Sequence, residues 1–350
     1  MRILFPIGDW VFGKNTNPYV RVLIEGLRGF GHDIDIGVDK FFDKAKNYDL
    51  IFFQWPDVLL AYAKVNRIDL IKEVRAVLNG LKSSETKTLI TCHNLHPHDN
   101  NQVVSSLYNL LYSNVNAIHH LGDFSYNLFK AKYPLIKHFI VPHPMFYDLY
   151  KYDKFISRSY LNISMKDTVV LAFGSFRNKE ETDLFINMVK GVGTSDITYL
   201  APQIPYGSLY NGRMLNRSIE FVRRWIKYKM LHIRPSGYVD ESLIPTYLAA
   251  SDIVFIQRKD ILNSGNVPLA FSAGKLVVGP QVGNVGSILK ETGNFVFCPD
   301  DIQSVIKAVK NACFSCKNGT DLGDRNYLYA NKYLTPQKTI NLLNKEIQSI

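Results

Sequence analysis

The sequence is poor in cysteine: it has four, Cys92, Cys298, Cys313 and Cys316, in 350 residues. So small a number excludes a disulfide framework as the main source of stability and indicates a reducing compartment, so we expect a cytoplasmic protein. Cys313 and Cys316 form a C-x-x-C pair, but no second cysteine or histidine pair accompanies it. We therefore interpret the pair as ordinary surface chemistry rather than a zinc site.

Long apolar runs are missing as well. No uninterrupted stretch approaches the roughly 18 residues of a membrane span. The first ten residues, MRILFPIGDW, have too short an apolar run for the core of a signal peptide. The sequence also lacks repeats and low-complexity tracts. We expect a protein that is soluble or only peripherally membrane-bound, long enough for two domains of ordinary size.

Metal-binding patterns are weak. His93, His96 and His98 lie within six residues, but no carboxylate or cysteine accompanies them at a familiar spacing. Asp33 and Asp35 alternate with isoleucines, which is typical of a strand rather than of a metal-binding acid pair. We therefore expect neither a metal nor another cofactor.

Positive charge is in excess, with 41 Lys and Arg against 31 Asp and Glu, a net charge of +10. Such an excess either keeps the surface soluble or attracts phosphates, on small ligands or on an anionic membrane face. Residues 58–81, which we predict to form one long helix, and the less regular segment 213–234 mix basic with apolar residues. Both suit a membrane surface, although an ordinary amphipathic helix on a sheet also explains the first. No nucleic-acid-binding module surrounds either segment, so we expect no nucleic-acid partner.

Short apolar runs alternate with helical patterns along the whole chain. Strands are predicted at 2–7, 34–36, 49–54, 88–92, 115–119, 140–142, 168–173, 197–200, 253–257 and 275–278. Residues 145–163 have no apolar period, and we interpret them as a linker. A final helix begins behind Thr335, with Pro336 at its first position. The pattern predicts an α/β protein with Rossmann-like order.

The most informative stretch is residues 260–286, DILNSGNVPLAFSAGKLVVGPQVGNVG. It predicts a loop, a short helix, a buried strand and a second glycine-rich loop. The helix opens behind Asn263, Ser264, Gly265 and Asn266, which place no bulky side chain over its first amides. Unpaired amides and the positive end of a helix dipole favour an anion such as a phosphate.

A second glycine turn precedes it in the chain. The predicted strand 168–173 leads into Gly174-Ser175-Phe176-Arg177-Asn178-Lys179. Two cations behind a glycine turn can neutralise the charge of a diphosphate, and we favour this role over the alternative of a basic surface turn.

A set of small, polar and turn residues is spread over about fifty positions of residues 237–289: Gly237-Tyr238, Pro245, Tyr247, Ala250-Ser251-Asp252, Ser264-Gly265, Pro268, Ala273-Gly274 and Gly283. In these residues the segment resembles the donor-binding half of GT-B type, nucleotide-sugar-dependent glycosyltransferases of the bacterial polysaccharide and lipid group. Many relatives carry two glutamates eight positions apart in this region, and Asn263 and Phe271 stand at those positions here.

The resemblance implies two Rossmann-like domains that face a central cleft. An acceptor-binding domain would span residues 1–150 and a donor-binding domain 151–334, and the helix at 335–350 would cross back to the first domain. The donor diphosphate would be held by Arg177, Lys179, Ser264, Gly265 and Asn266, and the nucleotide or sugar would contact Gly174, Tyr238 and Asn263. The Arg–Lys spacing is about one residue tighter than in relatives.

Several residues of the first domain follow predicted strands, where ligands of open α/β sheets bind. His93 is the candidate catalytic residue, as a general base or as a group that positions the acceptor. The other candidates for the acceptor site or the cleft are Asp9, Lys14, Asn15, Trp55, Asn94 and His119. Three alternatives remain open. Residues 9–15 could form a solvated turn, and Trp55 could be packed in the core. His120 could point into the cleft in place of His119.

The resemblance implies transfer of a sugar from a nucleoside-diphosphate sugar to a hydroxyl of a saccharide or lipid-linked saccharide, with possible contact to an anionic membrane. A dinucleotide-dependent dehydrogenase is excluded because no G-x-G-x-x-G follows the first strand. Two alternatives stay open. One is a sugar-nucleotide epimerase of the same fold, and the other is a non-catalytic saccharide-binding or adaptor protein.

Overall fold

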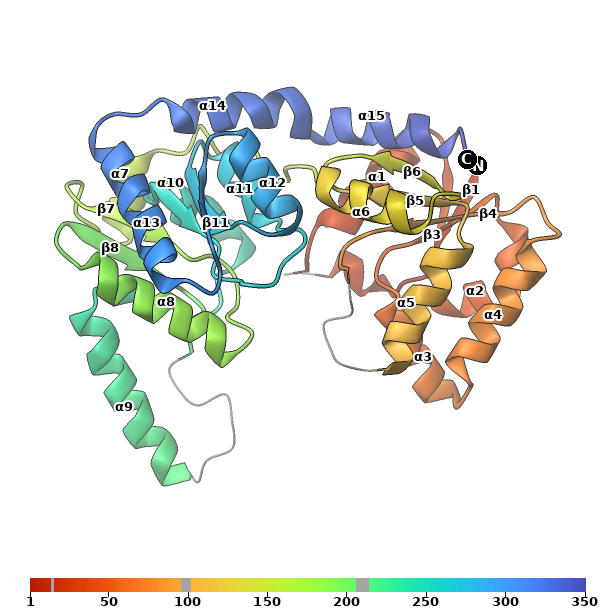
Figure 1. The fold of residues 1–350 in the computed structure, drawn as a ribbon, viewed down its shortest axis with the longest axis horizontal. Helices are drawn as coiled ribbons and strands as arrows, with labels where there is room; N and C mark the ends of the chain where they lie inside the picture. Colours follow the sequence, from red (N-terminus) through yellow and green to blue (C-terminus); the bar gives the residue numbers. More distant parts are fainter. Residues whose placement is uncertain (14–15, 96–101, 206–213) are drawn as a thin grey trace. The chain divides into compact units, whose positions relative to one another are not determined.

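The computed structural model describes residues 1–13, 16–95, 102–205 and 214–350, with side chains of the last range given from residue 221 on (Figure 1). The chain divides into two compact units. Unit 1 consists of Met1–Phe146 with Tyr333–Ile350, and unit 2 is Tyr147–Lys332.

Unit 1 is built on a parallel sheet of six strands, in the order β2-β1-β3-β4-β5-β6. The strands are β1 (Arg2–Phe5), β2 (Asp33–Ile36), β3 (Leu50–Phe53), β4 (Lys87–Thr91), β5 (Ala117–His120) and β6 (Lys137–Ile140). The helical elements are η1 (Asp9–Phe12), α1 (Tyr19–Gly29), α2 (Val38–Lys44), η2 (Ala45–Asn47), α3 (Asp57–Asn66), α4 (Leu70–Leu81), α5 (Gln102–Asn114), α6 (Asp123–Lys132) and α15 (Pro336–Ile347). After β1 the chain adds β2 on one side and β3 on the other, so β1 and β3 flank a topological switch point.

Unit 2 repeats this architecture, in the order β12-β11-β10-β7-β8-β9. Its strands are β7 (Thr168–Leu171), β8 (Ile197–Leu200), β9 (Ile233–Arg234), β10 (Ile253–Phe255), β11 (Leu276–Pro280) and β12 (Phe295–Phe297). The helical elements are α7 (Lys154–Tyr160), α8 (Lys179–Val192), α9 (Met214–Met230), η3 (Glu241–Leu243), α10 (Ile244–Ala250), α11 (Asn266–Ser272), α12 (Gly283–Glu291), α13 (Ile302–Lys317) and α14 (Leu322–Tyr329), and η4 (Ala330–Leu334) follows. Here the switch point lies between β7 and β10.

The two sheets confirm the predicted α/β fold with two Rossmann-like domains. All strand pairs are parallel, and β3, with the sequence LIFF, is buried along its whole length. Parallel strands covered by helices on both faces need such continuous apolar sequences. Helix α1 covers the sheet of unit 1 with an apolar stripe of Val20, Leu23, Ile24 and Leu27.

Helix α15 packs against α1 in unit 1. A Cβ at Gly26 of α1 would lie 2.7 Å from Ile340 of α15, so only glycine allows this approach. Ile340, Leu343 and Ile347 are 3%, 0% and 2% exposed in the core of unit 1. Helix α15 and strand β1 therefore contribute to the same hydrophobic core.

The predicted long helix over residues 58–81 is wrong, because the structure has α3 and α4 there. Arg67 adopts left-handed backbone angles (φ 54°) at the end of α3. The side chain of Asp69 accepts a hydrogen bond from the backbone N–H of Lys72 and caps α4. A left-handed residue followed by an N-cap separates the two helices although the apolar pattern continues.

The interpretation of residues 145–163 as a linker is wrong for its second half. Asp153 caps helix α7 by accepting the backbone N–H of Ile156. Arg158 of this helix is 1% exposed, donates to the carbonyls of Ala250 and Asp167, and pairs with Asp252 at 2.7 Å. This buried arginine fixes α7 within unit 2. The segment at 213–234, expected to be less regular, also contains a single helix of 17 residues, α9.

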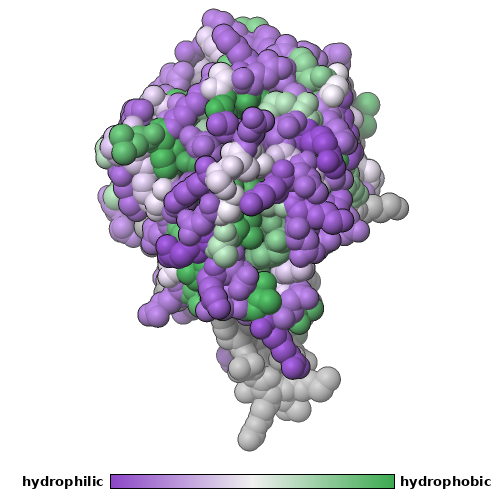
Figure 2. Space-filling view, turned by 90° about the vertical axis from the view of Figure 1, so that its right-hand side faces the viewer, coloured by the Kyte–Doolittle hydropathy of each residue, from purple (hydrophilic) through white to green (hydrophobic). Residues whose placement is uncertain are grey.

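Figure 2 shows the face of the molecule that carries α4. Hydrophilic residues dominate this face, and hydrophobic atoms form separate small areas between them. Scattered apolar atoms of this kind are normal for a protein surface.

Candidate active site

The glycine turn after β7 and the start of α11 lie side by side in unit 2. Gly174 has φ +93°, which favours glycine, and a Cβ there would lie 3.9 Å from Asn266 Nδ2. That amide donates a 2.8 Å hydrogen bond to the carbonyl of Phe173, 93 residues away in the chain. The two motifs identified in the sequence are thus joined at the carboxyl end of β7, beside the switch point.

Two arginines and one glutamate surround this turn. The backbone N–H of Arg177 donates to the carboxylate of Glu181 at 2.9 Å, and Asn178 caps α8 by accepting the N–H of Glu181. Glu181 is only 5% exposed, and its Oε1 lies 3.6 Å from Nε of Arg258. Burial and the nearby Arg177 charge lower the pKa of Arg258. One carboxylate thus contacts the Arg258 guanidinium and the Arg177 backbone, and the two arginine charges lie close enough to act on each other.

Arg258 belongs to no motif of the sequence and is an addition to the candidates named above. It follows β10 within Gln257-Arg258-Lys259, so the rule that selected His93, a polar residue at the carboxyl end of a strand, would have found it. Its Nε is buried and has no hydrogen-bond acceptor among the side chains that the structure describes. A cation held beside the switch point with an unused donor is suited to an anionic ligand.

The other donor-site candidates differ in their surroundings. The Lys179 side chain is 81% exposed, with Nζ 3.8 Å from Asp183. Asn263 Oδ1 accepts from Asn284. Ser264 Oγ accepts the N–H of Asn266 at 3.3 Å, and Gly265 precedes the seven-residue helix α11. Tyr238 is 61% exposed, and Phe271 is fully buried with its ring edge-on to Tyr329.

An aromatic cluster occupies the corresponding switch point of unit 1. Trp10 follows β1, Trp55 follows β3, and their ring centroids are 5.9 Å apart. The His93 ring, which follows β4, stacks on Trp55 at 5.0 Å and meets Tyr19 edge-on at 5.1 Å. Three loops thus bring two tryptophans and a histidine together at the carboxyl edge of sheet 1.

His93 is held as a neutral imidazole. Its Nε2 lies 3.0 Å from Oε1 of Gln54, a residue only 1% exposed. Burial, together with the neighbouring His119 and His143, lowers the pKa of His93 well below its usual value. A ring that stays neutral at physiological pH keeps an unprotonated nitrogen.

His119 and His120 are packed inside unit 1 instead of reaching the surface. His119 is 1% exposed, and its nitrogens contact Thr91 Oγ1 and the carbonyl of Val141, with burial lowering its pKa to about 4. His120 is fully buried between Ser125 and His138. Both rings therefore have structural hydrogen bonds.

The remaining candidates of unit 1 lie in loops. Asp9 begins η1 and is exposed, and the carbonyl of the half-buried Asn94 accepts the Tyr112 hydroxyl at 3.2 Å. Lys14, Asn15, His96 and His98 lie outside the described residues. No group of three or more His, Cys, Asp or Glu side chains within the described ranges could hold a metal ion.

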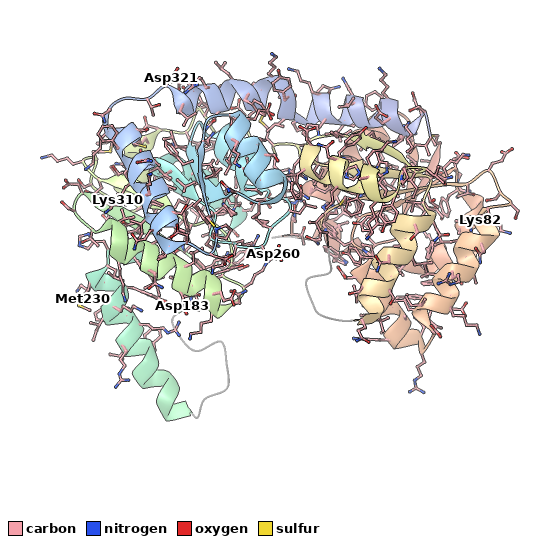
Figure 3. All side chains as sticks on the ribbon, in the orientation of Figure 1. Lys82, Asp183, Met230, Asp260, Lys310 and Asp321 are labelled. Carbon is pink, nitrogen blue, oxygen red and sulfur yellow. The ribbon has the colours of Figure 1, made fainter. Side chains whose placement is uncertain are left out.

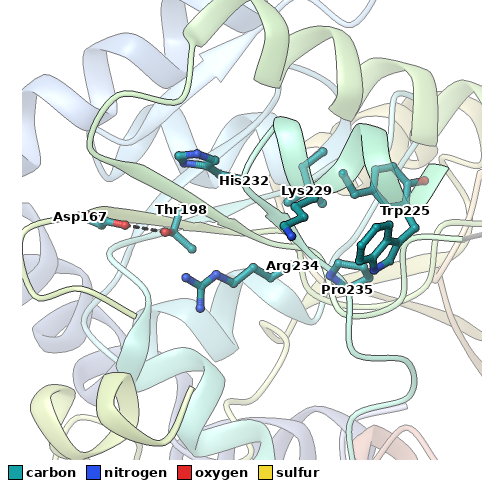
Figure 4. A pocket seen from close by; sticks show the side chains of 9 residues that line it. Asp167, Thr198, Trp225, Lys229, His232, Arg234 and Pro235 are labelled. Atoms are coloured by element: carbon teal, nitrogen blue, oxygen red, sulfur yellow. Dashed lines mark hydrogen bonds between the residues drawn. The ribbon is translucent and has the colours of Figure 1, made fainter. Parts of the chain in front are cut away.

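A separate pocket of about 420 Å³ lies beside β8, β9 and α9 of unit 2 (Figure 4). Trp225, Lys229, His232 and Arg234 line it, and the Thr198 hydroxyl donates to Asp167 on its wall. It shares no residue with the Gly174–Arg258 group, so it is not part of the candidate donor site.

No protein-family model matches the sequence, and no curated protein matches it significantly. Solved structures do match over essentially the whole chain. HepE from Anabaena in complex with UDP-glucose has a TM-score of 0.73 at 14% identity, covering 100% of both chains. Sucrose-phosphate synthase from Thermosynechococcus elongatus has a TM-score of 0.74 at 11% identity, covering 99% of this chain and 98% of that one.

A third similar structure is WaaG, a glycosyltransferase involved in lipopolysaccharide biosynthesis, with a TM-score of 0.62 at 11% identity and coverage of 98% and 99%. These similarities, together with the two parallel six-stranded sheets, define the GT-B fold, as the sequence resemblance predicts. The fold is shared with nucleotide-sugar glycosyltransferases. No helix in the described part of the chain is long and apolar enough to cross a membrane.

Proposed function

We propose that the protein is a glycosyltransferase that moves a sugar from a nucleoside-diphosphate sugar to a hydroxyl of a saccharide or lipid-linked saccharide. The observation that carries the proposal is the group formed by the Gly174 turn, Arg177 and Arg258 at the switch point of unit 2. An open turn beside two guanidinium groups suits a ligand with two adjacent phosphates.

In this proposal the donor diphosphate lies over the Gly174 turn. Arg177 and Arg258 stabilise the negative charge that builds on the departing diphosphate, with additional contacts from Lys179 and from the backbone of Ser264, Gly265 and Asn266. Fixed cations then do what a divalent metal does in other transferases, so the reaction needs no metal. Tyr238 and Asn263 contact the nucleotide or the sugar.

The acceptor binds unit 1 in this proposal. Trp10 and Trp55 offer flat apolar faces on which a sugar ring packs, next to the neutral imidazole of His93. His93 accepts the proton of the acceptor hydroxyl or holds that hydroxyl in place, and Asp9 and Asn94 add polar contacts. His119 positions this site from inside the unit through its bond to Thr91. A reducing compartment, and so a cytoplasmic location, is part of the proposal, because four cysteines are few for 350 residues.

UDP-glucose is the first donor to test, because it is the ligand bound in the similar HepE structure. Calorimetric titration with UDP-glucose and other nucleotide sugars should give saturable binding that Arg177→Ala weakens. Transfer is then measured with a panel of saccharide and lipid-linked acceptors. Absence of binding to every donor would contradict the proposal.

The same samples separate the alternatives. An epimerase converts the donor without any acceptor, so nucleotide sugars incubated with the protein alone are analysed for a second sugar. A binding or adaptor protein binds donor but gives no product on any acceptor. The proposed transferase releases the nucleoside diphosphate faster when acceptor is present.

A further inference from the structure

Helix α9 presents an apolar face to solvent. Val222, Trp225, Ile226 and Met230 are 52%, 48%, 45% and 67% exposed. They follow one another at intervals of three, one and four residues, which places them on one side of a helix. We refer to these four residues as the outer face of α9. Figure 3 labels Met230 at its C-terminal end.

The opposite side of α9 accounts for its packing on unit 2. Tyr228 is 1% exposed and donates through its hydroxyl to the carbonyl of Pro205, and Leu231 packs against the core. Figure 1 shows the C-terminal end of the helix beside the sheet of unit 2, while its N-terminal half runs away from it. These contacts with the core come from this side of the helix, whereas the four residues of the outer face are 45% to 67% exposed.

The charge of α9 indicates what the outer face binds. The helix sequence MLNRSIEFVRRWIKYKM has five basic residues and one acidic residue, Glu220, giving 5 − 1 = +4. Lys229 lies on the same side of the helix as the outer face, and its Nζ is 5.3 Å from the centre of the Trp225 ring. Arg223 follows Val222 at the edge of the face. Apolar side chains with a tryptophan and a surplus of lysine and arginine are typical of helices that lie in the interface of an anionic bilayer.

The pocket beside α9 adds to this charge. Lys229, His232 and Arg234 line it next to Trp225 (Figure 4). Arg234 uses one nitrogen, Nη1, for the carbonyls of Leu161 and Asn162. The pocket borders the outer face of α9. If that face lay in a bilayer, the basic side chains of the pocket would lie at the level of the phosphate headgroups.

We propose that α9 binds an anionic lipid surface, with its outer face in the headgroup–acyl boundary and its basic residues against the lipid phosphates. A second copy of this chain is the competing occupant, but the concentration of positive charge on the helix disfavours packing α9 against itself. The inference is independent of the transferase activity proposed above.

Flotation with vesicles tests the inference. Wild-type protein should float with vesicles of equal parts phosphatidylglycerol and phosphatidylcholine, and far less with phosphatidylcholine alone. The triple variant Val222→Ser, Trp225→Ser, Ile226→Ser should lose roughly tenfold or more in partitioning. Arg223→Gln with Lys229→Gln should lose roughly 30-fold, at about one factor of five per basic residue, and 500 mM salt should weaken wild-type binding similarly.

Matched controls use exposed residues away from α9. Leu135→Ser, Phe314→Ser and Leu328→Ser remove three side chains that are 100%, 70% and 65% exposed, and this variant should bind vesicles as wild type does. Lys307→Gln with Lys310→Gln, on α13, is the charge control. All variants should keep the wild-type melting temperature, since the altered residues are at the surface.

Three results would overturn the proposal. Wild-type protein that stays in solution with anionic vesicles contradicts it directly. Equal binding by the α9 triple variant and by its control assigns the lipid contact to another surface. A concentration-dependent dimer in analytical ultracentrifugation that the α9 triple variant abolishes, without vesicle binding, identifies the outer face as a contact between copies.

Discussion

Nε of Arg258 lies 3.6 Å from Oε1 of Glu181, and the same carboxylate accepts the backbone N–H of Arg177. Glu181 is buried at 5% exposure, so it holds the turn and the arginine in fixed positions. The carboxylate cancels only part of the positive charge around it. The positive charge that Glu181 does not cancel attracts an anionic ligand.

Arg258→Gln should weaken binding of a nucleoside-diphosphate sugar by roughly 10- to 100-fold, the usual effect of losing a charged hydrogen-bond donor. Calorimetric titration with UDP-glucose measures it. Lys259→Gln is the matched control, because the neighbouring lysine lies 3.6 Å from Asp300 instead of Glu181. Equal affinities of both variants would remove Arg258 from the donor site.

Substitutions of Arg177 and Lys179 should differ in their effect on donor binding, although the resemblance implies that both residues hold the diphosphate. Arg177 is close enough to Arg258 to lower the pKa of its guanidinium, whereas the Lys179 side chain is 81% exposed beside Asp183. We expect Arg177→Ala to reduce donor affinity roughly tenfold or more and Lys179→Ala only a few-fold. Steady-state kinetics and titration of both variants check the order. The reverse order would place the ligand along α8.

His93→Ala should keep donor binding and lower turnover, by about 10² to 10⁴ if the ring is a general base. A positioning role would instead appear mainly as a higher KM for the acceptor, and His93→Gln would then recover part of the activity. Melting temperature, donor affinity and turnover are measured on each variant. A destabilised variant with full activity per folded molecule would show that His93 is only structural.

The pH profile gives an independent test of His93. Because its pKa is held well below the usual value, the imidazole stays neutral as the pH falls through 6.5. Turnover that depends on the neutral ring should therefore remain level from pH 8 to below 6.5 and fall only at more acidic pH. A loss of activity centred near pH 6.5 and absent in His93→Gln would contradict this state of the ring.

Transfer should continue in EDTA, because fixed cations take the place of a metal in the proposed mechanism. Activity is measured after dialysis against the chelator and again after adding Mg²⁺ or Mn²⁺. Complete loss on chelation, restored by either ion, would reveal a metal site that the proposal lacks.

Lys275 should make the free energy of unfolding depend on pH in the alkaline range. Burial lowers its pKa from 10.5 to about 8 in the fold, although Asp252 opposes the shift. Between these values the unfolded chain binds more protons than the native one, so this group makes the free energy of unfolding rise from about pH 8 to 10.5. Lys275→Met should lack this rise. Urea unfolding of both proteins at several pH values isolates the contribution, and parallel curves would contradict it.

The sequence predicts the sheets well and the boundaries of some helices poorly. Buried parallel strands such as β3 are continuous apolar runs, which few other structures produce. The break between α3 and α4 was missed because the apolar pattern continues across Arg67, while the backbone angle and the Asp69 cap act locally. Helix α9 was expected to be less regular because basic and apolar residues are interleaved along the segment.

Candidate site residues can be selected from the sequence where they belong to a motif. Gly174 and Asn266 were selected separately, but their contact depends on tertiary structure and is invisible in the chain order. Arg258 is a single residue without a motif, so only its position at the end of β10 identifies it. The side to which His119 and His120 point could not be derived, because a strand buried on both faces gives no alternation between apolar and polar residues.

The approach of Ile340 to Gly26 has a consequence for how the chain acquires its structure during synthesis. Unit 2, residues 147–332, is synthesised between the two parts of unit 1. Unit 1 starts earlier but has an unfinished apolar face on α1 until Ile340, Leu343 and Ile347 arrive. The first part of unit 1 therefore keeps that face uncovered while the whole of unit 2 is synthesised, until α15 closes it.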